Sequence, residues 1–197
     1  HGAAVAEVVH DLAPLARLHL YPFQTDVEFL STARALAEEA ADVINGSIGF
    51  DNTWHADGTS PYTKAVDTLT ATGVLWAAGN EGNRYLAGPL TDADADGDVE
   101  IWGVEGVWVP VVAGTADLSF RWSEAMRHAK LDLDLFIESE AGLPCGSSTE
   151  AQDGAPSAPL EGVVASCPGH WAWAHVRQQS GGPADLEGLT GWLYAPQ

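Results

Sequence analysis

Apolar positions in the first part of the chain follow the period of a helix and the period of a strand in turn. Val5, Val8 and Val9 recur on one helix face, and Pro14 ends that helix because proline cannot continue one. The pattern predicts helices that begin near residues 1, 26 and 60, and strands over residues 16–21, 42–50 and 74–78. Helices and strands that alternate at short spacing are typical of a doubly wound parallel sheet.

The segment from residue 71 to residue 82, ATGVLWAAGNEG, carries a candidate site. Its apolar run, residues 74–78, is expected of a parallel strand covered on both faces. Gly79 and Gly82 then allow a sharp turn that presents Asn80 at the carboxyl end of the strand, where open α/β sheets bind ligands. The segment also fits an ordinary turn in which Asn80 only fills a turn position.

The hydrophobic pattern changes near residue 88. Beyond it the helical period is lost, and leucine alternates with aspartate on residues 131–135, which places one face of a strand on a core. Short strands are expected over residues 99–104, 107–113, 117–122, 131–138, 162–166, 171–177 and 189–194. The sequence therefore predicts an α/β unit over residues 1–88, with a partial parallel sheet and flanking helices, and a β-sandwich-like unit over residues 89–197.

Acidic residues outnumber basic ones by 28 to 8, and the net charge at pH 7 is -20. Nucleic acid is not expected as a partner, because phosphate binding needs clustered Lys and Arg, and an anionic membrane surface is not expected for the same reason. No apolar run approaches the roughly 20 residues that span a bilayer, so membrane insertion is not expected. The pattern leaves the oligomeric state unknown.

Cys145 and Cys167 are the only cysteines. They flank a long loop, a placement that suits a disulfide in an exported protein. We therefore expect their Cα atoms to lie within about 7 Å of each other, and we expect a secreted, cell-surface or periplasmic location. Because the chain starts with His rather than Met, it is also expected to be a piece of a longer protein.

Three motifs, in this order, resemble the subtilisin-like serine proteases, the subtilase family. Residues 1–6, HGAAVA, resemble the family's histidine motif at the start of a helix. Residues 45–49, NGSIG, resemble the strand that pairs with the substrate backbone, and residues 77–82, AAGNEG, resemble the segment that carries the oxyanion-hole Asn. The family's fold, a parallel sheet flanked by helices, agrees with the fold predicted from periodicity.

The resemblance implies a serine endopeptidase that hydrolyses a polypeptide substrate and requires no cofactor for catalysis. His1 would be the general base, since imidazole takes up and releases protons near neutral pH. Asn80 would donate a side-chain N–H to the oxyanion. The substrate backbone would be bound by Ser47, Ile48, Gly49, Ala78 and Gly79.

Two motifs of the family's Asp, His, Ser order are missing. The Asp motif would precede His1, and no Gly-Thr-Ser motif follows Asn80. A Gly-Thr-Ser run does end at Ser60, but it precedes Asn80, and its serine is better explained as a helix cap. The 197-residue chain alone is therefore expected to be inactive. The alternative is a non-catalytic subtilase-like scaffold whose β-rich unit binds a partner or a polymer.

The second half resembles a β-rich insertion that some bacterial and archaeal subtilases carry between the Asn and Ser motifs. Three features support this: an aspartate-rich run at residues 92–98, the sequence FRW at 120–122, and DLDL at 132–135. Tryptophan is frequent in this half, where it is expected to fill the core, with a carbohydrate or peptide platform as the alternative. The tryptophans concerned are Trp102, Trp108, Trp122, Trp171, Trp173 and Trp192.

The aspartate-rich run matches the start of a calcium loop, D-x-D-x-D-G. Gly103 stands where such a loop has its bidentate Glu, so an EF-hand is not expected. A structural calcium site and a solvated acidic turn both remain compatible with the run. The candidate calcium ligands are Asp92, Asp94, Asp96 and Asp98.

Overall fold

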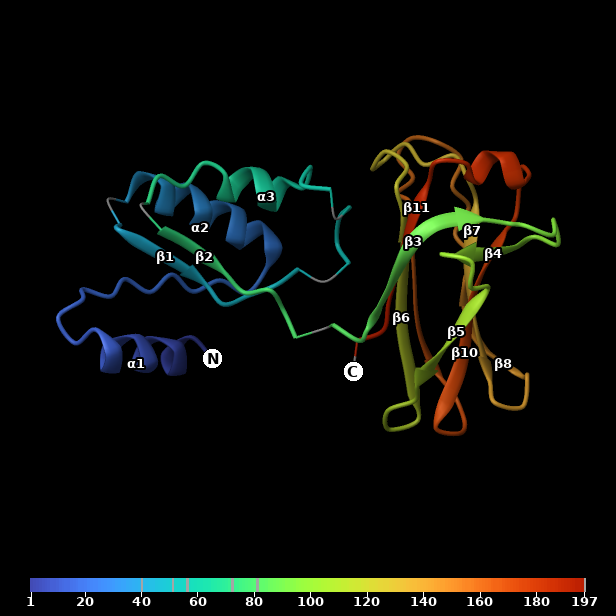
Figure 1. The fold of residues 1–197 in the computed structure, drawn as a ribbon, viewed down its shortest axis with the longest axis horizontal. Coiled ribbons are helices and arrows are strands. Elements are labelled where there is room, and N and C mark those ends of the chain that lie inside the picture. The colour runs from blue at the N-terminus through green and yellow to red at the C-terminus, as the bar shows by residue number, and fades with distance from the viewer. Residues whose placement is uncertain (40, 51, 56, 72, 81, 197) are drawn as a thin grey trace. The chain divides into compact units, whose positions relative to one another are not determined.

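The computed structural model describes residues 1–39, 41–50, 52–55, 57–71, 73–80 and 82–196. The chain forms two compact units, His1–Asn80 and Glu81–Gln197 (Figure 1). Strand β3 (Tyr85–Thr91) belongs to the second unit because it pairs there with β11 (Thr190–Tyr194) and β4 (Asp98–Ile101).

The described residues of the first unit form three helices and a small parallel sheet. Its elements are α1 (Gly2–Leu12), α2 (Asp26–Glu38), β1 (Val43–Gly46), α3 (Pro61–Val66) and β2 (Gly73–Trp76). Thr25 caps α2 in a capping box: its Oγ1 accepts the Glu28 N–H at 3.2 Å, and the Glu28 carboxylate accepts the Thr25 N–H at 3.2 Å. Ser60 caps α3 as expected, accepting the Thr63 N–H at 2.9 Å.

The core of the first unit is small and aromatic. Phe29 of α2 and Ile44 of β1 are buried. The ring of Phe29 packs against the rings of Phe50, Tyr62 and Trp76. Figure 1 shows α2 and α3 on one side of the two strands and α1 on the other. Helix α1 buries none of its residues, so only one face of the sheet is well covered.

The predicted fold class, α/β with a subtilisin-like parallel sheet, is wrong. The structure is mostly β, with 18% of the chain in helices and 35% in strands. Among the described residues the parallel sheet contains only β1 and β2. Residues 16–21 alternate as predicted but form no strand, and Leu20 is 67% exposed. Alternation produces a strand only where a partner strand exists, and no strand among the described residues pairs with this segment.

The second unit contains nine of the strands. Beyond β3, β4 and β11 they are β5 (Gly106–Pro110), β6 (Thr115–Trp122), β7 (Leu133–Ser139), β8 (Pro144–Ser148), β9 (Leu160–Ser166) and β10 (Trp171–Gln178), and a short helix, η1 (Pro183–Leu186), precedes β11. The strands form one antiparallel sheet in the order β8-β7-β10-β4-β3-β11-β6-β9, and β5 pairs with β10 outside this path.

The two edge strands of this sheet, β8 and β9, come together. The Gly162 N–H of β9 donates to Ser148 Oγ of β8 at 3.2 Å, and a Cβ placed on Gly146 would lie 2.7 Å from Ala165 Cβ. The sheet is therefore nearly closed, like a barrel, and not the predicted β-sandwich. The period-2 pattern predicts which face of each strand is buried, but two packed sheets and one curled sheet bury the same faces.

Strand β6 supplies the centre of the barrel core, where Leu118, Phe120 and Trp122 are at most 1% exposed. The expectation that tryptophans fill this core holds for Trp122. It does not hold for Trp102, which is 72% exposed, or for Trp108 and Trp171.

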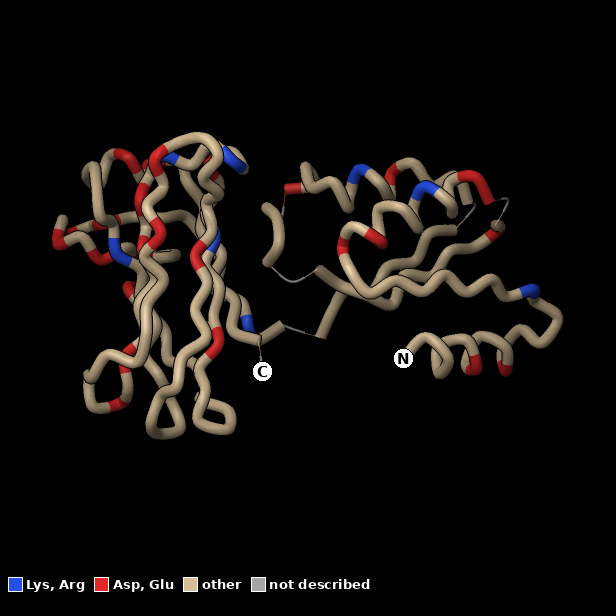
Figure 2. Tube along the Cα trace, turned by 180° about the vertical axis from the view of Figure 1, so that it is seen from behind, with Lys and Arg blue, Asp and Glu red and all other residues tan. Residues whose placement is uncertain are grey.

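Figure 2 shows Asp and Glu positions distributed over both units, with the few Lys and Arg positions scattered among them. Across the described parts of the chain, no helix combines the length and the apolar character needed to cross a lipid bilayer.

Candidate functional site

The first candidate site lies at the carboxyl edge of the β1–β2 sheet. The strands are parallel, with Gly46 opposite Trp76, and the Ala77 N–H donates to Gly46 O at 2.9 Å. The segments after both strands therefore leave the sheet at the same edge. Ser47, Ile48 and Gly49 follow β1, and Ala78, Gly79 and Asn80 follow β2. All six predicted substrate or oxyanion residues thus follow strand ends at one edge.

His1 is brought to this edge from a position 46 residues away. It precedes α1, and its Nε2 lies 3.1 Å from Ser47 O. Because a carbonyl oxygen only accepts, Nε2 must carry a proton in this contact, and in the neutral ring the lone pair is then on Nδ1. The ring is exposed to solvent. In this tautomer His1 can accept a proton through Nδ1 while the Ser47 carbonyl fixes the orientation of the ring.

Ser47 is not placed as a nucleophile toward His1. Its hydroxyl accepts a hydrogen bond from Asn45 Nδ2 at 2.9 Å, whereas His1 contacts its carbonyl. The nucleophile of a serine mechanism would therefore have to come from another part of the protein.

The turn that carries Asn80 depends on Gly79. Gly79 has φ +85°, a left-handed conformation that side chains disfavour, and no heavy atom lies within 4 Å of where its Cβ would be. Glycine is needed here for conformation and not for space. Asn80 itself is exposed.

The predicted metal ligands divide into two groups. Asp92, Asp94 and Asp96 lie on the loop between β3 and β4, with one carboxylate oxygen of each within 4.8 Å of the others. Asp98 instead accepts hydrogen bonds from Arg177 Nε at 2.9 Å and Nη2 at 3.0 Å. These hydrogen bonds lower the pKa of Asp98, against the opposing effect of desolvation. Asp98 is therefore occupied by a bidentate ion pair with β10.

Sequence reasoning missed a cleft on the second unit. Trp108 of β5, Trp171 of β10 and Glu140, which follows β7, line an open cleft of about 510 Å³. The two indoles are 52% and 49% exposed. The run WAWAHV at residues 171–176 could have indicated this surface. Its small alanines occupy the inward positions of the strand, so the tryptophans that alternate with them point outward.

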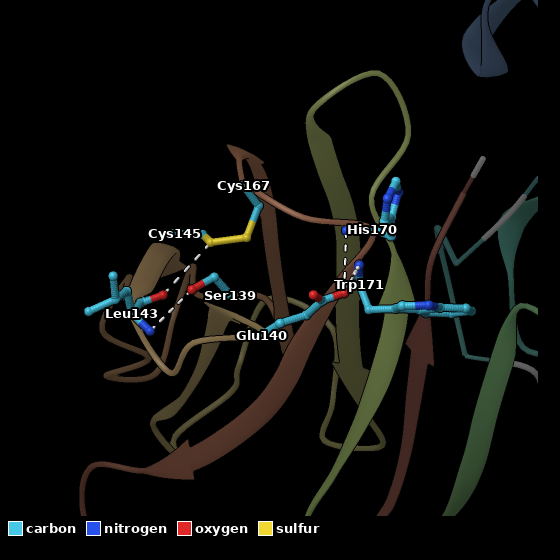
Figure 3. The surroundings of a disulfide bond; sticks show 7 residues. All are labelled: Ser139, Glu140, Leu143, Cys145, Cys167, His170 and Trp171. Atoms are coloured by element: carbon cyan, nitrogen blue, oxygen red, sulfur yellow. Dashed lines mark hydrogen bonds between the residues drawn. A yellow bond between two sulfur atoms is a disulfide. The ribbon is translucent and has the colours of Figure 1, made fainter.

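Figure 3 shows how Glu140 is held beside the disulfide. Its Oε1 accepts the backbone N–H groups of His170 at 3.3 Å and Trp171 at 3.0 Å. Cys145 and Cys167 form the expected disulfide, with Cα atoms 5.2 Å apart. The carboxylate of Glu140 is thus fixed against the backbone at the start of β10.

No model of a known protein family matches the chain, and no curated protein does so either.

Proposed function

We propose that the first unit supplies the general base and one oxyanion donor of an exported, subtilisin-like serine endopeptidase. One observation supports this proposal above all: the hydrogen bond between His1 Nε2 and Ser47 O, which joins the first two motifs. The third motif leaves the sheet at the same edge, because β1 and β2 are parallel. A histidine without a function at this site would not be expected to contact a residue 46 positions away at the same strand edge.

In this mechanism His1 takes the proton of a serine hydroxyl through Nδ1 as the hydroxyl attacks the scissile carbonyl, and later returns it to the leaving amine. The Asn80 side-chain N–H donates to the oxyanion that develops. The extended substrate adds as a strand beside residues 47–49. The serine would come from another part of a longer chain, and the chemistry requires no cofactor. Because Ser47 O holds Nε2 and the serine needs Nδ1, an aspartate of the longer chain would orient the ring only by replacing the Ser47 contact.

The test uses the longest gene product that contains this chain. It should cleave a peptide amide and react with a fluorophosphonate, which labels activated serines, whereas the 197-residue chain should do neither. His1→Ala should abolish labelling. Asn80→Ala should retain labelling and reduce turnover by about 100- to 1000-fold, a magnitude taken from subtilisin itself. A full-length product that lacks an activated serine would refute the proposal.

The second candidate function is non-catalytic, and the Trp108–Trp171 cleft favours it. Two half-exposed indoles beside a fixed carboxylate form a site for a Lys or Arg side chain, which stacks on the indole faces and pairs with Glu140. The net charge of -20 also attracts a basic segment. In this alternative the second unit binds a basic polypeptide.

An Arg-rich peptide should then quench the tryptophan fluorescence of the whole chain, and salt should weaken the effect. Trp108→Ala should abolish binding. Trp102→Ala is the matched control, since it removes a more exposed tryptophan outside the cleft. Equal loss in both variants, or quenching by a neutral oligosaccharide in place of the peptide, would contradict a basic partner.

A further inference from the structure

The loop between β3 and β4 turns sharply and gathers its carboxylates. It covers the six residues from Asp92 to Gly97. Ala95 has φ +62° and Gly97 has φ +93°, and the Gly97 N–H donates to Asp92 Oδ2 at 3.2 Å. The Asp98 N–H donates to Asp96 Oδ1 at 2.9 Å. One oxygen each of Asp92, Asp94 and Asp96 falls within 4.8 Å of the others.

Asp92 provides an observation that does not follow from loop geometry. Its side chain is only 7% exposed, and its Oδ1 is buried without a hydrogen-bond partner among the described residues. A buried carboxylate oxygen that accepts nothing is strongly unfavourable, and nearby like charges make it more so. A cation at this position would relieve both effects.

Arg177 is close enough to Asp96 to interact with it electrostatically, but it forms no hydrogen bond to the cluster. Arg177 places its guanidinium on Asp98 and not on the three clustered carboxylates. Glu100 is also turned elsewhere, accepting from Thr91 Oγ1 at 3.0 Å and from the Ala93 N–H. The charge of the cluster is therefore left for a ligand to neutralise.

We propose that Asp92, Asp94 and Asp96 bind one calcium ion, which ties the β3–β4 loop to the barrel. Three carboxylate oxygens form a hard donor set without imidazole or thiolate, which suits Ca²⁺ or Mg²⁺ and not zinc. Ca²⁺ fits better because it accepts irregular geometry, and the exposed Asp94 and Asp96 leave room for water ligands. This site does not depend on the proposed peptidase function.

The test is calcium titration of the whole chain after chelator treatment, by calorimetry and thermal unfolding. The wild type should bind one Ca²⁺, and its Tm should rise with calcium concentration. Equal concentrations of Mg²⁺ should give a smaller rise.

Asp92→Asn should remove the calcium response, yet in chelator it should unfold at the wild-type temperature or higher, because it loses a buried unpaired charge. Asp94→Asn removes a second proposed ligand. Because Asp94 is exposed, this variant should fold normally even if Asp92→Asn does not. Asp117→Asn, an exposed aspartate on β6, is the matched control and should respond like the wild type. Absence of calcium binding by the wild type, or an unchanged response in Asp92→Asn and Asp94→Asn, would overturn the proposal.

Discussion

Individual carboxyl groups in the second unit ionise differently because of their surroundings. Burial, with the negative charges of Asp132 and Glu161, raises the pKa of Asp134 to about 6. An unfolded aspartate has an ordinary pKa of about 4. Between about pH 4 and pH 6 the folded chain therefore holds a proton that the unfolded chain releases, so the free energy of unfolding falls as pH rises through this window.

Asp134→Asn should flatten this pH dependence and increase the free energy of unfolding at pH 7 by about 1–2 kcal/mol, since it removes a buried charge with like-charged neighbours. Urea denaturation at several pH values between about 4 and 7 measures both effects. Asp98 does not interfere, because its lowered pKa places its contribution at more acidic pH. Burial also raises the pKa of Glu161, so a weaker pH dependence of the same sign should remain in the variant. A slope unchanged from the wild type would show that Asp134 is not the titrating group.

At the scale of elements, the position of β5 depends on Gly106. A Cβ at this residue would lie 2.6 Å from the backbone oxygen of Ala174 and 2.6 Å from the ring of Trp173. The Ala174 carbonyl cannot move aside as a flexible side chain can, so a larger residue at position 106 must push β5 away from β10. Trp108 lies two residues further along β5, so the cleft depends on this close approach.

Gly106→Ala should therefore decrease the free energy of unfolding by about 1–3 kcal/mol and should change the tryptophan emission as Trp108 moves. Gly162→Ala on β9 is the matched control, since its new Cβ would meet its nearest neighbour at 3.8 Å. Denaturation curves and emission spectra of both variants provide the comparison, and equal behaviour would contradict the steric argument.

At the scale of the whole second unit, the disulfide joins the two edges of the sheet. Cys145 lies on β8 and Cys167 follows β9, and the cysteines are 22 positions apart in sequence. Such a cross-link lowers the conformational entropy of the unfolded chain, which increases the free energy of unfolding by about 3 kcal/mol. It also holds together the two strands that no ladder pairs.

The double variant Cys145→Ala with Cys167→Ala should unfold at lower urea concentration, with a decrease of about 3 kcal/mol in the free energy of unfolding. Adding a reductant to the wild type should give the same midpoint, and the double variant should not respond to reductant. A wild type whose midpoint is insensitive to complete reduction would show that the closure of the barrel does not depend on the bond.

The sequence by itself determined features that short segments specify. The Ser60 cap was predicted because capping needs only neighbouring residues, and seven of the nine strands described in the second unit were predicted because alternation is local. Strands β3 and β8 were missed, because neither segment alternates apolar and polar residues clearly. The cysteine pair was also predicted correctly, since only two cysteines are present. The candidate residues His1 and Asn80 came from short motifs, and their catalytic roles stay predictions.

Only the tertiary structure decided which segments meet. The sequence pattern of residues 16–21 could not show that no strand pairs with them, and alternation could not show that β8 and β9 close the sheet. The pairing of Asp98 with Arg177 spans 79 residues, and the contact of His1 with Ser47 spans 46. Such contacts depend on the free energy of the whole folded chain, because burial and pairing compete over long distances, and no local pattern contains that competition.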